Sequence, residues 1–233
     1  MEEYLKPVSK QCTQRIFEQM NNISFGIIKY TNQICFFTKI KYKNINIPVL
    51  ITNYQIIDYI ANNNKYLNIY INNELNKIEI GKGKYFNKDY DLAIIQIKEN
   101  DKINFLDIDD NIYKKEIENY YNKESIYIIN YNNKNEISVA YSIINNINNY
   151  EIFYSRYFKN NNNNILPIFN LSNNKLIGIH IKNSKYYYKG LIFNFIINEF
   201  IEEYKIEKND TLNEIDILMK INKIDINKNI YIF

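Results

Sequence analysis

Short β-branched and aromatic segments, separated by clusters of Asn, Asp, Lys and Gly, recur along most of the chain. Such segments are typical of strands, and the clusters between them are typical of turns. Because the segments follow one another with short connections, the pattern favours an all-β barrel or sandwich over alternating βα units. The expected strands cover residues 24–30, 34–41, 46–52, 66–72, 75–80, 91–97, 124–130, 136–144, 149–155, 165–170, 175–182 and 187–195.

Two other segments have the spacing of helices. Residues 7–22 predict an N-terminal amphipathic helix, and residues 196–204 predict a helix that closes the β region. The expected apolar face of the first helix consists of Val8, Cys12, Ile16, Phe17 and Met20.

Polar stretches mark the expected loops and the start of the tail. The Asn runs at residues 62–64 and 160–164 predict loops, because Asn favours turns and tolerates left-handed conformations. The tail begins with a charged stretch after Lys205 and continues with strand-like runs at residues 214–221 and 228–233. We therefore expect a C-terminal β hairpin.

The composition is that of a globular protein. Of 233 residues, 46% are hydrophobic and 24% are charged, which is too apolar for intrinsic disorder. The net charge of +3 is too balanced to indicate a nucleic-acid partner. No segment approaches the ~18 consecutive apolar residues of a membrane span, so we expect no membrane association.

Residue types that hold metals or form disulfides are scarce. With two cysteines and one histidine, we expect no disulfide framework, no metal site and no cofactor. The N-terminal residues lack the basic and apolar regions of a secretory signal, so we expect an intracellular or virion protein. Asn makes up roughly a fifth of the chain beside excess Ile, Lys and Tyr, which indicates a genome very low in G+C.

Three segments carry residues with a chemical meaning, and they occur in an informative order. An apolar strand at residues 48–57 ends in Thr52 and Asn53 and is followed by a short helical turn. An acidic residue, Asp91, opens a second apolar strand. A loop, a proline and a strand at residues 162–169 come before a further strand that contains one glycine.

Together these segments resemble the trypsin-like (chymotrypsin-fold) serine peptidases, in particular the trypsin-like peptidase domain proteins of low-G+C giant viruses and protists. In that family a strand ending in T-A-A-H or T-N-N-H supplies the general base, and an Asp opening a D-L-A-I-type strand orients it. The nucleophile lies three residues before the proline of G-D-S-G-G-P, and a strand of L-I-G-I type follows. The resemblance covers about residues 24–201.

The resemblance implies a mostly β fold with two six-stranded antiparallel barrels. The barrels are expected over about residues 23–110 and 111–204, which together form one domain, residues 23–204. The N-terminal helix, within residues 1–22, precedes this domain, and the β tail of residues 205–233 follows it.

Carried over position by position, the triad of the family is incomplete. Asp91 stands at the position of the orienting acid, but Gln55 stands at the position of the base. Counting back from the proline places Asn164 at the nucleophile, with Asn162 and Asn163 in the former oxyanion loop. A carboxamide neither accepts a proton near neutral pH nor attacks a carbonyl. Loss of the base or the nucleophile alone costs about a million-fold in such a site, so we expect no peptidase activity.

Two interpretations remain open for His180 and two for Asp91. Gly178 and His180 lie on the strand that lines the specificity pocket in this family, and in glutamate-specific members a histidine at this position binds the substrate carboxylate. His180 is either a surviving binding group for acidic side chains or a lone core or surface histidine left from an active ancestor. Asp91 is either a remnant of the triad or a residue that caps a turn or pairs with Lys or Tyr.

Other hydroxyl and thiol groups do not restore the nucleophile. No Ser or Cys lies between Arg156 and Leu171, and the nearest hydroxyls, Ser155 and Ser172, are expected to be structural. Cys35 is expected to be buried in a strand. Cys12 lies on the N-terminal helix.

The function expected from these residues is that of a catalytically inactive homologue, a pseudoprotease kept for binding or assembly. An extended peptide would pair with an exposed strand edge around residues 175–183 and 186–191. The alternatives are an active serine-type endopeptidase with a non-standard site, and a structural virion component. Self-association is a further expectation, because β chains present edges that another copy can cover.

Overall fold

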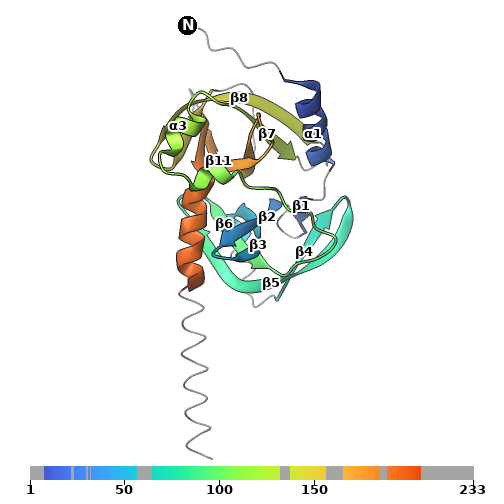
Figure 1. The fold of residues 1–233 in the computed structure, drawn as a ribbon. Coiled ribbons are helices and arrows are strands. Elements are labelled where there is room, and N and C mark those ends of the chain that lie inside the picture. The colour runs from blue at the N-terminus through green and yellow to red at the C-terminus, as the bar shows by residue number, and fades with distance from the viewer. Residues whose placement is uncertain are drawn as a thin grey trace, which may run out of the picture.

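The computed structural model describes residues 8–21, 24–29, 31, 33–56, 65–131, 137–155, 165–183 and 188–205. Figure 1 shows two stacked barrels, with the orange helix of the last described residues running beside the lower one. The loops expected at residues 62–64 and 160–164 lie outside the described residues, as does the expected C-terminal hairpin.

The first barrel is closed and antiparallel. Its strand order is β1-β2-β3-β6-β5-β4, and the pairing of β1 with β4 closes it. Side chains alternate between the barrel interior and the outside, as in β4, where every second residue is buried. The strands are β1 (Phe25–Ile28), β2 (Ile34–Tyr42), β3 (Ile45–Asn53), β4 (Tyr66–Ile71), β5 (Glu74–Asn87) and β6 (Leu92–Ile97).

The second barrel repeats this topology. Its order is β10-β11-β12-β9-β8-β7, again closed and antiparallel. The expected fold class, two six-stranded antiparallel barrels, is therefore confirmed. The strands are β7 (Ser125–Tyr131), β8 (Ile137–Asn148), β9 (Glu151–Tyr154), β10 (Leu166–Asn170), β11 (Leu176–Asn183) and β12 (Tyr188–Ile192).

Some elements differ from the expectation. Strand β5 continues to Asn87, past a register shift between Ile80 and Lys84, because a bulge at this point lets the strand bend and follow the barrel. Two short helices, Asp110–Tyr113 and Ile117–Tyr121, occur where no element was expected. The last helix covers residues 193–205 and is longer than expected at its N-terminal end.

The N-terminal helix α1 (Lys10–Met20) lies against the second barrel, although the first barrel follows it in the chain. The Cys12 thiol donates to the Leu171 carbonyl at 3.2 Å, and Gln19 Nε2 donates to Asn174 O at 2.7 Å. Ile16 is the buried residue of the helix. The expectation for Phe17 was wrong: its side chain is 58% exposed, because the face that docks follows the four-residue spacing of Cys12, Ile16 and Met20.

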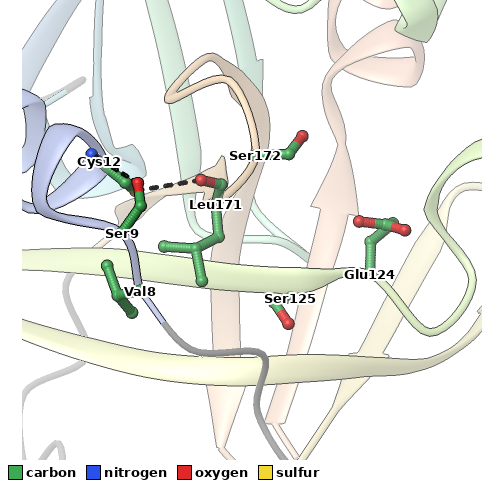
Figure 2. Close-up of a pocket in the computed structure, with 7 residues that line it drawn as sticks. All are labelled: Val8, Ser9, Cys12, Glu124, Ser125, Leu171 and Ser172. Atoms are coloured by element: carbon green, nitrogen blue, oxygen red, sulfur yellow. Dashed lines mark hydrogen bonds between the residues drawn. The ribbon is translucent and has the colours of Figure 1, made fainter.

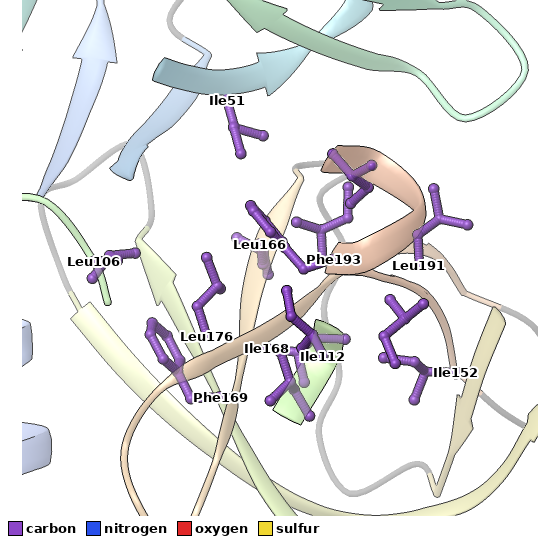
Figure 3. Close-up of a cluster of buried hydrophobic side chains, with 14 of the residues drawn as sticks. Ile51, Leu106, Ile112, Ile152, Leu166, Ile168, Phe169, Leu176, Leu191 and Phe193 are labelled. Carbon is purple, nitrogen blue, oxygen red and sulfur yellow. The ribbon is translucent and has the colours of Figure 1, made fainter. Parts of the chain in front are cut away.

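The two barrels are joined by segments that cross between them. Leu106 bridges β2 and Ile108 bridges β11 in parallel register, so the linker is attached to both barrels. One hydrophobic core continues across the junction, where Ile51 of β3 faces Leu106, Ile112 and the interior of the second barrel (Figure 3). Among the described residues, the helices are too short or too polar for any of them to cross a membrane.

Candidate functional site

The acidic residue at the expected triad position lies at the junction of β3 and β6. These strands pair antiparallel, and their last pair is Asn53 with Leu92. Asp91 directly precedes Leu92, so this register brings it beside Tyr54 at the end of β3. Asp91 has φ 51°, in the left-handed region that Asp tolerates better than most residues.

The carboxylate of Asp91 is held by neighbours from its own barrel. Asn53 Nδ2 donates to Asp91 Oδ2 at 2.7 Å, and the backbone N–H of Tyr54 donates to Asp91 Oδ1 at 3.0 Å. The same N–H also lies 2.9 Å from the backbone carbonyl oxygen of Asp91. Of the two interpretations left open by the sequence, these contacts match a carboxylate that fixes a turn.

The Asn53 side chain connects the two barrels at this point. Its amide nitrogen binds Asp91, and its Oδ1 accepts a long hydrogen bond, 3.4 Å, from the backbone N–H of Ile165. Ile165 follows the expected nucleophile position in the sequence and is buried. The structure therefore brings Asp91 close to the end of the segment in which the nucleophile was expected.

Gln55 lies one turn beyond β3, in the 3-10 helix η1 (Tyr54–Ile56). Its side chain is exposed, and Gln55 Oε1 accepts from Gln33 Nε2 at 3.1 Å. Gln33 is buried, and its own Oε1 has no hydrogen-bond partner among the described residues. The position expected for a base thus carries a pair of neutral carboxamides.

The expected nucleophile position, Asn164, and the former oxyanion loop, Asn162 and Asn163, lie outside the described residues. The nearby hydroxyls make local contacts: Ser155 Oγ donates to Asn145 Oδ1, and Ser172 Oγ donates to Asn170 Oδ1. Each of these two hydroxyls therefore has a hydrogen-bond partner within the second barrel.

His180 occupies a buried position in β11, directly across from Leu166 of β10. Its Nδ1 lies 2.6 Å from the hydroxyl of Tyr154 on β9. The ring of Tyr188 packs edge-on against the imidazole, with centroids 5.5 Å apart. Three strands of the second barrel therefore contribute to one buried polar and aromatic cluster.

The hydrogen bond between Tyr154 and His180 is sensitive to the proton on each partner. Burial raises the pKa of Tyr154 well above its ordinary value, so the phenol keeps its proton at physiological pH. When the phenol donates, Nδ1 is the acceptor and the proton of the neutral imidazole lies on Nε2. Such an imidazole can donate a hydrogen bond to an oxygen.

Gly178 lies two residues before His180 on the same strand. A Cβ at this position would collide with the carbonyl oxygen of Leu191 on β12 and would lie 2.8 Å from Ile152 Cδ1. The close approach of β12 therefore accounts for a glycine here.

A separate hollow of about 190 Å³ lies at the other end of β10, beneath α1. Figure 2 shows Cys12 and Ser9 on one side of it and Glu124 and Ser125 on the other. In the part of the chain that the structure describes, no three His, Cys, Asp or Glu side chains are grouped as metal ligands. The Cys35 thiol is fully buried, and burial raises its pKa far above the ordinary value.

Sequence reasoning missed the residues that connect these positions. The sequence pattern assigns no role to Asn53, Gln33 or Tyr154, whose hydrogen bonds to Asp91, Gln55 and His180 are seen in the structure. The amide in Thr52-Asn53 was the only available signal, since Tyr154 is one of 23 tyrosines.

Comparisons with known proteins agree with this fold. No family model matches the sequence, and no curated protein matches it. Among solved structures, Deg5, a trypsin-like serine protease, is similar at a TM-score of 0.53 and 12% identity, over 83% of this chain and 95% of that one.

A second similar structure comes from the work on aromatic interactions that drive the coupled folding and binding of the intrinsically disordered Sesbania mosaic virus VPg protein. Its TM-score is 0.52 at 11% identity, over 76% of this chain and 89% of that one. At such low identities the likeness concerns the fold alone. With its two closed barrels, the chain has a chymotrypsin-like fold.

Proposed function

We propose that this protein is a catalytically inactive homologue of the trypsin-like serine peptidases that binds extended peptides in the former substrate cleft. The observation that carries the proposal is the set of contacts of Asp91. Its carboxylate is engaged by Asn53 and Tyr54, while the neighbouring Gln55 pairs with Gln33. The groups that contact Asp91 and Gln55 are carboxamides and a backbone N–H, and such groups cannot take a proton from a nucleophile.

The binding half of the proposal rests on the end of β11. Strand β11 pairs with β12 as far as Asn183, opposite Tyr188, whereas its pairing with β10 among the described residues ends at His180. Among the described residues, the backbone of residues 181–183 pairs on the β12 side alone, and we propose that a peptide strand pairs on the other side. Main-chain hydrogen bonds would hold the peptide, and alternate side chains would enter pockets.

His180 is the residue from which we propose that the cleft prefers peptides with an acidic side chain. We propose that the imidazole, whose Nδ1 lies 2.6 Å from the Tyr154 hydroxyl, is the group that contacts an acidic side chain of the peptide. We therefore propose that the bound peptide carries Glu at the residue nearest β11. One solved structure with a similar fold concerns the binding of a disordered protein, which is the kind of ligand proposed here.

The catalytic half is tested with a fluorophosphonate probe and fluorescent casein, using active trypsin as the positive control. We expect neither labelling nor hydrolysis by the wild-type chain. Labelling that a single substitution abolishes would show an active hydrolase and overturn this half of the proposal.

The binding half is tested by fluorescence anisotropy with an extended Glu-containing peptide. The matched control is the same peptide methylated at alternate backbone nitrogens, which removes its donors without changing its side chains. We expect the methylated peptide to bind at least about tenfold more weakly, because each lost hydrogen bond costs roughly 0.5–1.5 kcal/mol. Equal affinity of the two peptides would overturn pairing at the strand edge.

A further inference from the structure

We propose that Cys12 is a modification site, where a small cationic aminothiol is held as a mixed disulfide in the hollow beneath α1 and loosens the contact of this helix. The walls of the hollow, which has a volume of about 190 Å³, include Ser9, Cys12, Glu124, Ser125 and Leu171 (Figure 2). The proposal goes beyond the peptide cleft, because it concerns another surface of the second barrel and a covalent ligand.

The Cys12 thiol lies at the contact between α1 and the second barrel. Its S–H donates to the Leu171 carbonyl oxygen at 3.2 Å, and its Sγ accepts from Asn174 Nδ2 at 3.7 Å. The residue is half-buried and borders the hollow. A reagent that enters the hollow therefore reaches this sulfur.

A second residue of the hollow points independently to a ligand. Ser125, the first residue of β7, is 3% exposed, and it lines the same hollow as Cys12. Its hydroxyl forms no hydrogen bond with any other described residue. Because a buried hydroxyl without a partner is unfavourable, a polar ligand in the hollow would be stabilised by pairing with it.

The size and charge of the hollow indicate the class of ligand. An enclosed cavity of about 150 Å³ holds a molecule the size of benzene, so this hollow has room for a short aminothiol. Among the described residues that line it, Glu124 is the one charged side chain. An ammonium group donates both to a carboxylate and to a hydroxyl oxygen, which suits Glu124 and Ser125 together.

The proposed step is an exchange with the disulfide form of the aminothiol, which is the co-reactant. The Cys12 thiolate attacks one sulfur of that disulfide, so that a new S–S bond forms and the S–S bond of the reagent breaks. The other half leaves as a thiolate and takes up the proton that Cys12 released; Cys12 is oxidised and the leaving half is reduced. The product has no S–H, so the Leu171 carbonyl loses its donor and α1 is held less firmly.

Cys35 provides an internal comparison. Its side chain is fully buried in β2, and its thiol donates to the Gly26 carbonyl oxygen at 3.4 Å. Burial raises the pKa of this thiol far above the ordinary value, so little thiolate forms there. We therefore expect Cys35 to stay unmodified in the folded chain.

A redox buffer of cystamine and cysteamine tests the ligand, with intact-mass analysis and peptide mapping of the full chain. The matched pair is dithiodipropionate and mercaptopropionate, which is similar in length but carries a carboxylate in place of the ammonium. The exchange constant of Cys12 with each reagent is divided by that of the urea-unfolded chain, which removes the intrinsic difference between the reagents. We expect this ratio to be at least about fivefold higher for cysteamine.

Two variants test the side chains around the ligand. Glu124→Gln should bring the two ratios to within about twofold of each other, and Ser125→Ala should lower the cysteamine ratio about threefold. Ser155→Ala is the matched control, because the Ser155 hydroxyl donates to Asn145, and it should change neither ratio. Equal ratios for the two reagents in the wild type, as much adduct on Cys35 as on Cys12, or no adduct would overturn the proposal.

Hydrogen exchange tests the loosening of α1. In the modified chain we expect the amides of Lys10–Met20 to exchange about fivefold faster than in the unmodified chain, because the loss of one hydrogen bond makes local opening easier. The Cys12→Ser variant should exchange at the same rate with and without the cystamine buffer. Unchanged exchange in the modified wild-type chain would contradict the proposal.

Discussion

The two sides of the candidate site, one from each barrel, differ in how their polar groups are held. In the first barrel, Gln55 is exposed and pairs with another carboxamide, Gln33. In the second, His180 is 2% exposed and its imidazole is enclosed by Tyr154 and Tyr188. Gln55, which is open to water, can be replaced more easily than a member of the buried cluster around His180, since an unpaired buried group is costly.

The comparison suggests a division of roles. Under the proposed function, the side of the cleft that moves protons in an active peptidase carries the carboxamides of Gln55 and Gln33, and the Asp91 carboxylate accepts from the backbone N–H of Tyr54. The side that would have recognised a side chain keeps an ordered imidazole. Under the proposed function, binding depends on the second barrel and tolerates change in the first.

The largest effect is expected for His180→Ala. The substitution opens a cavity and leaves the Tyr154 hydroxyl buried without its partner, so we expect a loss of about 3 kcal/mol in the free energy of unfolding. Urea unfolding measures it. A loss below about 1 kcal/mol would mean that the second-barrel cluster is no more constrained than the first-barrel pair.

A smaller loss is expected for Asp91→Ala. It removes a charged acceptor of two hydrogen bonds and places alanine at a left-handed φ, so we expect about 2 kcal/mol of destabilisation. Asp91→Asn is the matched control, because Asn tolerates this φ and keeps one acceptor oxygen; it should lose about half as much. Equal unfolding free energies for wild type and Asp91→Ala would contradict a turn fixed by this carboxylate.

Alkaline pH should destabilise the second barrel through Tyr154. Its folded pKa is raised, so its contribution is fully present below the unfolded value near 10 and is lost as the pH rises above it. At pH 11 one such group costs about 1.4 kcal/mol relative to pH 9. Urea unfolding at both pH values should show a smaller difference in Tyr154→Phe than in the wild type, and an identical difference would argue against a buried phenol.

The smallest effect is expected for Gln55→Ala. Its side chain is exposed, but its Oε1 accepts from the buried Gln33 Nε2, so we expect the free energy of unfolding to fall by about 1 kcal/mol. Gln55→His should likewise leave fluorescent-casein hydrolysis at background, because Asp91 remains bound to Asn53 and Tyr54. A stability loss near that of His180→Ala would remove the difference between the two sides of the site.

Much of the fold could be predicted from the sequence, because a strand with one buried face shows an alternation of apolar and polar residues. The expected strand at residues 46–52 lies within β3. The segment that contains Gln55 and the segment that begins with Asp91 were expected to meet, and in the structure Asp91 contacts Tyr54, which directly precedes Gln55. The short helix Ile117–Tyr121 was missed for a physical reason: its N-cap, Glu116, has a left-handed conformation and makes no side-chain capping bond.

The contacts of the site could not be predicted in the same way. The bridge from Asn53 to Ile165 joins residues of different barrels and depends on how the barrels pack. The contact of Tyr154 with His180 depends on β12 lying between β9 and β11, a pairing order that no local pattern encodes. The candidate positions named from the sequence therefore stay predictions, and the contacts that surround Asp91, Gln55 and His180 could be found from the structure alone.

Affinity selection from a library of extended peptides, followed by mass spectrometry of the retained and released fractions, tests the central proposal most directly. The account predicts that Glu-containing peptides are retained by the wild-type chain and recovered intact after prolonged incubation. Recovery of cleaved peptides, or retention of none, would contradict it.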